Sequence, residues 1–159
     1  MDELLKLLEN NARMSLEDIA AMLGKSEAEV SAMMDLARAQ GLIQGYKTLV
    51  DWQKAGVDRV EAVIELHVSP KKSHGFDDIA ATIASFDEVE SVLLMSGGYD
   101  LQLTIKGRNF QEIALFVAKR LSPLDDVLST ATHFVLRTYK REGKMFLGEE
   151  TDERELTVL

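Results

Sequence analysis

Apolar residues recur at helical spacing in three short stretches of the first forty residues, and each stretch has start and stop signals. The first is a leucine stripe that ends at Asn10. The second begins after Ser15 and stops at Gly24, and the third begins after Ser26 and stops at Gly41. Both serines have an acidic residue three positions later, as in a helix-capping box. The pattern therefore predicts three helices, with a short turn between the second and the third.

Farther along the chain, the spacing of apolar residues changes from the helical period to the alternation that is typical of strands. Residues 42–51 are expected to be extended, and a turn signal follows at residues 52–56. From Val60 to Val68 apolar and polar residues alternate, which predicts a half-buried strand. The remaining predicted elements are helix 76–83, strand 89–95, strand 101–105, helix 110–117 and strand 127–139.

This βαββαβ order is that of a ferredoxin-like domain, in which an antiparallel sheet carries both helices on one face. The other sheet face is left uncovered, and Val63, Val92 and Leu94 are expected to lie on it. An apolar uncovered face is typical of an oligomer interface, so we expect at least a dimer.

The predicted fold is α+β, with a winged-type helix-turn-helix followed by the ferredoxin-like βαββαβ domain. We place the first domain at residues 1–56, the second at 57–140 and a C-terminal extension at 141–159. The acidic EETDE between MFLG and RELTVL favours a small hairpin in that extension over a solvated tail.

Two capped helices joined by a short turn that contains glycine form a helix-turn-helix, whose second helix presents exposed residues to the major groove of DNA. Any other helical hairpin would have the same spacing. The helices alone therefore leave DNA binding open.

The composition narrows the classes of function. The chain has no cysteine, which removes disulfides and thiolate chemistry, and no apolar run long enough to cross a membrane. Its start is acidic where a secretory signal would be basic, so we expect a cytoplasmic protein without a membrane partner. His67, His74 and His133 are far apart, and Asp77 and Asp78 are typical first-turn acids of a helix. We predict no catalytic residue, cofactor or metal site.

Three segments carry a family resemblance: GLIQGYKTLVDW after the third helix, LMSGGYDLQLTI between two strands, and STATHFVLRTYKREG in the last strand. In this order and spacing the chain resembles the Lrp/AsnC family over nearly its whole length. The resemblance implies double-stranded DNA as a partner of the first domain. For the second domain it implies an amino-acid effector and a homodimer that assembles further, for example into an octamer.

The resemblance also places the effector pocket near one turn, with help from the last strand. The predicted contacts are Ser96, Gly97, Gly98, Tyr99, Asp100, Thr130 and Thr132. Glycines let a backbone N–H approach a carboxylate, the aspartate can accept hydrogen bonds from an ammonium group, and the threonines add hydroxyls. The alternative is a simple hairpin turn with the aspartate as its local partner. His133 is left out, because a lone strand histidine is more often packed or solvated.

The charge of the recognition helix complicates the DNA prediction. The net charge of the chain is -9, and residues 1–56 alone carry six basic and nine acidic residues. Where the family pattern implies a basic residue and a leucine, this chain has Met33 and Ala37. The predicted DNA contacts are Lys25, Ser26, Ser31, Arg38 and Lys47. An alternative function is an effector-sensing oligomer with weak or lost DNA binding that acts through a related regulator.

Overall fold

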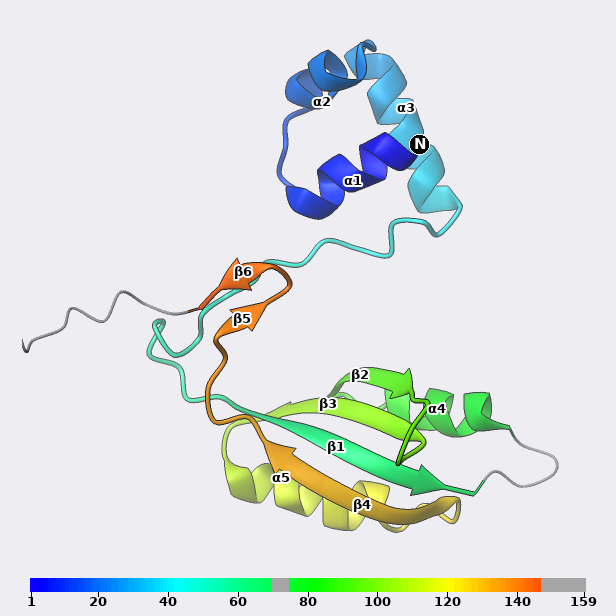
Figure 1. Cartoon of the computed structure of the whole chain (residues 1–159), viewed down its shortest axis with the longest axis vertical. Coiled ribbons are helices and arrows are strands. Elements are labelled where there is room, and N and C mark those ends of the chain that lie inside the picture. Colours follow the sequence, from blue (N-terminus) through cyan, green and yellow to red (C-terminus); the bar gives the residue numbers. More distant parts are fainter. Residues whose placement is uncertain (70–74, 147–159) are drawn as a thin grey trace, which may run out of the picture. The chain divides into compact units, whose positions relative to one another are not determined.

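The computed structural model describes residues 1–69 and 75–146. The chain divides into two compact units, Met1–Val50 and a second unit from Asp51 onward. The division falls six residues before the boundary expected from the sequence. Figure 1 shows the elements of each unit.

Unit 1 contains three helices, α1 (Asp2–Asn10), α2 (Leu16–Leu23) and α3 (Glu27–Ala39). The side chains that form its core come from all three helices: Leu4, Leu8, Ile19, Ala20 and Val30. A helix of this length is marginal by itself, so burial of these faces against one another supplies most of the stability of the unit.

Both predicted capping serines begin their helices. The Ser15 side chain accepts a hydrogen bond from the Asp18 N–H, and Ser26 with Glu29 forms a complete capping box. Gly24 ends α2 with a φ of 62°, in the left-handed region that favours glycine. These local signals fix the tight turn between α2 and α3.

The residues after α3 carry no paired strand in the described part of unit 1. Residues 43–50 have no regular secondary structure, so a wing is not formed there as a β-hairpin.

Unit 2 has the predicted ferredoxin-like order. Its elements are β1 (Val60–Val68), α4 (Phe76–Ala84), β2 (Val89–Leu94), β3 (Leu101–Gly107), α5 (Phe110–Phe116), the π-helix η1 (Val117–Leu121) and β4 (Val127–Phe134). The strands form one antiparallel sheet in the order β2-β3-β1-β4. Figure 1 shows α4 and α5 behind the same face of this sheet.

The alternation of apolar and polar residues along β1 determines which of its side chains enter the core of unit 2. Ala62, Ile64 and Leu66 are fully buried, and β3 adds Leu101 and Leu103 beside them. The helices cover these residues, mainly through the buried side chains Ile79, Ile83, Ile113 and Phe116.

The uncovered face differs from the expectation. Val63 lies on it, but Val92 and Leu94 pair directly with Leu103 and Leu101, which places them on the helix-covered face. The prediction for Val92 and Leu94 was wrong because the register between β2 and β3 shifts between Val89 and Ser91.

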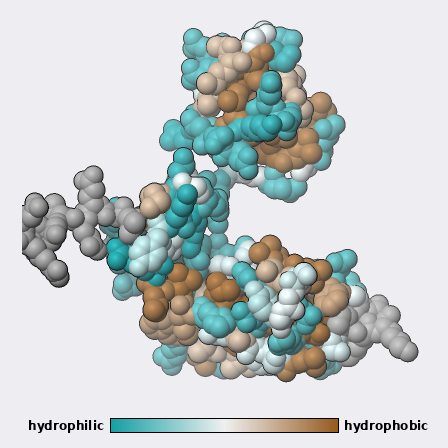
Figure 2. All heavy atoms as spheres, in the orientation of Figure 1, coloured by the Kyte–Doolittle hydropathy of each residue, from teal (hydrophilic) through white to brown (hydrophobic). Residues whose placement is uncertain are grey.

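The open face is also mostly polar. In register it carries Glu61, Glu65, His67, Gln102, Thr104, Lys106 and His133, with Val63, Leu93 and Ala131 as apolar members. Figure 2 shows hydrophilic and hydrophobic residues mixed over the side of unit 2 that faces the viewer. The expected large apolar face is therefore absent from the described strands.

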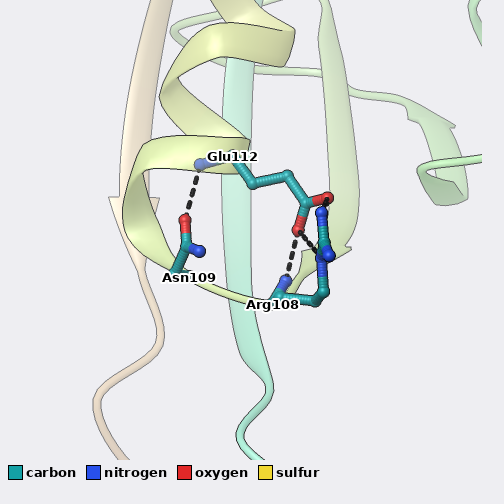
Figure 3. A network of polar contacts seen from close by, with 3 residues as sticks. All are labelled: Arg108, Asn109 and Glu112. Atoms are coloured by element: carbon teal, nitrogen blue, oxygen red, sulfur yellow. Dashed lines mark hydrogen bonds and ion pairs between the residues drawn. The ribbon is translucent and has the colours of Figure 1, made fainter.

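The start of α5 is held by a small polar network (Figure 3). The Asn109 side chain caps the helix by accepting from the Glu112 N–H at 2.8 Å. The Glu112 carboxylate in turn accepts from the Arg108 N–H at 2.5 Å and from Arg108 Nη2 at 3.1 Å. These hydrogen bonds hold the pKa of Glu112 below its usual value.

The last predicted strand is shorter than expected, since β4 ends at Phe134. A two-stranded hairpin follows, made of β5 (Lys140–Arg141) and β6 (Lys144–Met145). Arg141 Nη2 lies 2.7 Å from Glu61 Oε1 and ties this hairpin to β1. The hairpin expected around EETDE lies outside the described residues.

Candidate functional site

The exposed face of α3 is the candidate DNA-reading surface. Val30 and Ala37 point into the core of unit 1, whereas Glu27, Ala28 and Asp35 are exposed. This face presents mainly carboxylates and methyl groups, and the cation near its end, Arg38, lies 3.5 Å from the Asp35 carboxylate. A helix of this kind can contact bases, but it adds little attraction for phosphates.

The predicted DNA contacts are not equally available. Lys25 is exposed in the turn between α2 and α3, and Lys47 is exposed beyond α3. The Ser26 hydroxyl is occupied, since it donates to Glu29 Oε2 at 2.8 Å and accepts from the Glu29 N–H at 3.3 Å. Ser31 is half-buried, and Arg38 lies 3.5 Å from the Asp35 carboxylate. Lys25 is therefore the clearest candidate for a phosphate contact, and Lys47 stays a predicted contact.

Glu29 is part of the helix cap. It accepts hydrogen bonds from the Ser26 N–H at 2.9 Å and from the Ser26 hydroxyl, which hold its pKa below the ordinary value of 4.5. The carboxylate therefore stays charged at neutral pH beside the start of α3.

Met33 and Ala37, where the chain departs from the family pattern, both face the interior. Ala37 is fully buried, and Met33 is half-buried against the core of unit 1. The exposed alanine beside Met33, Ala32, is the better position at which to add a cation without disturbing packing.

The candidate effector turn connects β2 to β3. Ser96, Gly97 and Gly98 are exposed, and Tyr99 and Asp100 are half-buried. Neither glycine has a left-handed φ, and a Cβ at either would meet nothing within 4 Å. The fold of the single chain therefore does not require glycine here, and what the pair provides is a bare backbone open to a ligand or to another chain.

Asp100 is anchored to β1. Its N–H donates to the Leu66 carbonyl at 2.9 Å, and its Oδ2 accepts from the Val68 N–H at 2.9 Å. His67 Nδ1 lies 3.9 Å from the same oxygen. One carboxylate oxygen of Asp100 is thus engaged within the chain, with β1 rather than with the turn itself.

Within one chain the predicted effector residues fall into two groups. Thr130 and Thr132 pair with Leu66 and Ile64, so their half-buried side chains lie on the helix-covered face. Tyr99 donates a hydrogen bond to Gln102 at 2.9 Å, on the open face. The fold brings the five turn residues together but separates both threonines from them.

One neighbour of Asp100 was not predicted from the sequence. His67 lies beside its carboxylate, and Ser129 is in turn the partner of His67 across β1 and β4. A signal was present, because His67 and Glu65 alternate with the buried residues of β1, but the partner strand could not be read from the sequence. His133, on the same face, lies 3.6 Å from Glu65.

Other kinds of site find no support among residues 1–69 and 75–146. No group of three or more metal-ligating side chains is assembled there. No helix in the same ranges is long and apolar enough to cross a membrane.

Comparison with known proteins agrees with this division. Residues 3–42 match the AsnC-type helix-turn-helix domain, and residues 61–145 match the Lrp/AsnC ligand binding domain. YugG of Bacillus subtilis (strain 168), an uncharacterised HTH-type transcriptional regulator, is 44% identical over 96% of this chain and 92% of its own length.

Solved structures with the same fold include two methionine complexes. The transcriptional regulator NMB0573/L-Met complex from Neisseria meningitidis has a TM-score of 0.70 and 20% identity, covering 87% of this chain and 88% of its own. The feast or famine regulatory protein (Rv3291c) from M. tuberculosis complexed with L-methionine has a TM-score of 0.71 and 20% identity, covering 89% and 92%. At these identities the likeness shows the fold alone.

Proposed function

Because the chain belongs to the Lrp/AsnC family of transcriptional regulators, we propose that unit 1 binds double-stranded DNA while unit 2 oligomerises and binds an amino-acid effector. Membership of this family makes the chain a transcriptional regulator and not an enzyme. The DNA contacts proposed are Lys25 and Lys47, with the exposed face of α3 in the major groove.

The effector site proposed is the turn Ser96–Asp100. The observation that supports it is the glycine pair, whose backbone is exposed although the fold of the chain needs glycine at neither position. Open N–H groups suit a carboxylate. Two relatives in fold are complexes with L-methionine, which favours an amino acid as the class of effector.

Oligomerisation is proposed for two reasons. Thr130 and Thr132 can complete an effector site only if it draws on more than one chain, since they lie on the other sheet face from the turn. Each chain also brings only a small number of cations to DNA, so tight binding needs contacts from several subunits. Linked subunits gain avidity without new kinds of contact. We infer a homodimer that assembles further in the cytoplasm.

The experiment is fluorescence anisotropy of the intact chain with labelled duplexes selected from genomic fragments at low salt, with and without each of the twenty amino acids. Lys25→Ala should weaken binding. Lys6→Ala is the matched control, because Lys6 is already paired with Asp2 at 2.7 Å on α1. Absence of selective binding by the intact oligomer at low salt would contradict the proposal for unit 1.

The effector site is tested in the same assay. Gly98→Val should abolish the response of DNA binding to the amino acid, because a side chain would cover the open backbone of the turn. Gly75→Val is the control, since a Cβ at Gly75 also meets nothing within 4 Å. An unchanged response in Gly98→Val would exclude the turn as the site.

A second candidate follows from the acidic α3. The chain could sense the effector and act by mixing with a related regulator, with little DNA affinity of its own. Ala32→Arg distinguishes this candidate from direct DNA binding, because it adds a cation at an exposed position of α3. If this change creates selective DNA binding that the natural chain lacks, the second candidate is supported.

A further inference from the structure

The two fully buried residues of α3 determine which of its side chains point away from unit 1. These are Val30 and Ala37. An α-helix turns about 100° per residue, so a residue two positions from either of them lies on the opposite side of the helix. Four exposed residues meet this condition: Ala28, Ala32, Asp35 and Ala39. We call these four residues the outward line of α3.

The outward line is mainly a row of methyl groups. An alanine side chain is short, so the helix backbone can approach a partner closely, and its methyl group meets another apolar group best at about 3.5 to 4.0 Å. Leu36, which flanks the line beside Ala32, is 49% exposed and adds apolar surface. In the major groove of DNA the matching apolar group is the C5-methyl of thymine.

Asp35 is the polar member of the outward line. Its carboxylate can only accept hydrogen bonds, and 69% of the side chain is exposed. Arg38 Nη2 lies 3.5 Å from its Oδ1, which is longer than the roughly 2.7 to 2.9 Å of a charge-assisted hydrogen bond. The carboxylate is therefore open to a stronger donor. In the major groove an aspartate accepts from the N4 amino group of cytosine.

The arginine of α3 is placed differently. Guanine is recognised in the major groove by the paired donors of an arginine or by a lysine. Arg38 directly follows the buried Ala37, so it lies on the flank of α3 rather than on the outward line, and it belongs to the last turn of the helix. Because the N-terminal part of a recognition helix contacts the bases, Arg38 is poorly placed to select guanine.

The outward line also limits the number of base pairs that α3 can contact. Ala28 and Asp35 are seven residues apart in the helix, which is about 10 Å at about 1.5 Å per residue. Base pairs are spaced about 3.4 Å apart along the duplex. The three residues Ala28, Ala32 and Asp35 therefore cover about four base pairs.

We propose that α3 selects DNA half-sites by thymine methyl groups and a cytosine amino group, within about four base pairs, and not by guanine. Ala28 and Ala32 each contact a thymine C5-methyl, and Asp35 accepts a hydrogen bond from a cytosine N4 amino group. The inference rests on the proposed function that unit 1 binds DNA, and the match of residues 3–42 to the AsnC-type helix-turn-helix domain points to the same ligand independently. It adds which bases are selected and by which side chains.

The thymine contacts are tested with the full chain at low salt. Duplexes of about 25 base pairs are first selected from a random pool, and each thymine of the selected site is then replaced singly by deoxyuridine, which removes only the C5-methyl. Two thymines in each half-site should be sensitive, each weakening binding about fourfold. This scan uses the natural chain, so it does not depend on the folding of any variant.

The side chains are assigned by combining the scan with variants. Ala28→Gly and Ala32→Gly should each remove the sensitivity at one thymine, because the protein methyl group is then missing. Ala21→Gly is the matched control, since Ala21 is exposed on α2 and the change has a similar cost to helix stability. Thermal melting checks the fold of each variant.

The cytosine contact is tested by a change of base preference. Asparagine both donates and accepts hydrogen bonds and pairs with adenine in the major groove, so Asp35→Asn should change the preferred base at one position of each half-site from cytosine to adenine. Glu9→Gln is the control, because it removes one exposed negative charge from α1. An increase in affinity that both variants share reports the change in charge, whereas the change of base should be confined to Asp35→Asn.

The possible failures are distinguishable. Selective binding in which no thymine is sensitive to deoxyuridine, or in which Asp35→Asn leaves the base preference unchanged, would overturn the inference and leave the proposed function intact. The same holds if Ala28→Gly and Ala32→Gly keep the full sensitivity, or if the half-site requires a guanine and Arg38→Gln removes that requirement. Absence of any selective binding would contradict the proposed function of unit 1, and the inference would fall with it.

Discussion

The salt dependence of DNA binding depends on how many cations unit 1 brings to the phosphates. Each phosphate neutralised releases counterions, so the logarithm of the binding constant falls with the logarithm of salt concentration with a slope of about -0.9 per contact. Three basic side chains lie in or after the turn that begins α3: Lys25, Arg38 and Lys47. The Arg38 guanidinium lies 3.5 Å from the Asp35 carboxylate, so part of its charge is already neutralised within α3.

The number of these side chains that contact phosphates sets the lower and upper limits of the slope for a dimer on two half-sites. If only Lys25 of each subunit contacts a phosphate, the slope is about -1.8, and if all three do, it is about -5.4. Between 50 and 200 mM salt the affinity should then fall between about 10-fold and about 2,000-fold. Lys25→Ala should make the slope shallower by about 1.8, with Lys6→Ala unchanged.

Anisotropy titrations at several salt concentrations measure this slope directly. The duplex should be about 25 base pairs long, enough for two half-sites one helical turn apart and too short for a larger assembly to engage further subunits. A slope steeper than about -7 would refute the reasoning, because it requires more cations than the α3 region of two subunits holds.

Three further predictions concern stability. Ser26→Ala should lower the free energy of unfolding by about 1 kcal/mol in urea titrations, because it removes the N-cap of α3; equal midpoints for both chains would argue against the cap. Folding lowers the pKa of Glu29 below 4.5, so the stability it adds is present above its unfolded pKa and is lost as pH falls through the folded value. The urea midpoints of Glu29→Gln and the natural chain should therefore differ at pH 7 and converge towards pH 3, whereas a constant difference would contradict the assignment. Gly107→Ala should destabilise by about 1 to 3 kcal/mol, since the new Cβ would lie 2.9 Å from Ile113 Cγ1, while Gly97→Ala, with nothing within 4 Å, should leave the melting temperature unchanged.

Local sequence signals predicted most of the secondary structure. The serine caps, the glycine stops and the period of apolar residues depend on near neighbours in the chain, and all three helices of unit 1 begin and end close to the predicted residues. The alternation along β1 predicted its buried face, because side chains point to opposite sides of a strand whatever its partners are. The family resemblance rested on segments that the sequence shows directly.

The open sheet face could not be predicted in the same way. Val92 and Leu94 have the composition of an uncovered apolar face, but the register shift in β2 turns them toward the helices. Such a shift depends on how two strands pair, which the sequence of one strand does not encode. The pairing of β4 with β1 likewise separates Thr130 and Thr132 from the turn that they were predicted to assist.

By itself, then, the sequence determined the kinds of element, their order and the family, because these follow from local periodicity and from short motifs. Only the tertiary structure decided which side chains meet. Glu88 and Arg120 are far apart in the chain but lie 3.6 Å from each other, and the Asp100 carboxylate accepts a hydrogen bond from the Val68 N–H. Contacts of this range arise from the packing of α5 on the sheet and from the pairing of β3 with β1. They are properties of the whole fold rather than of any segment.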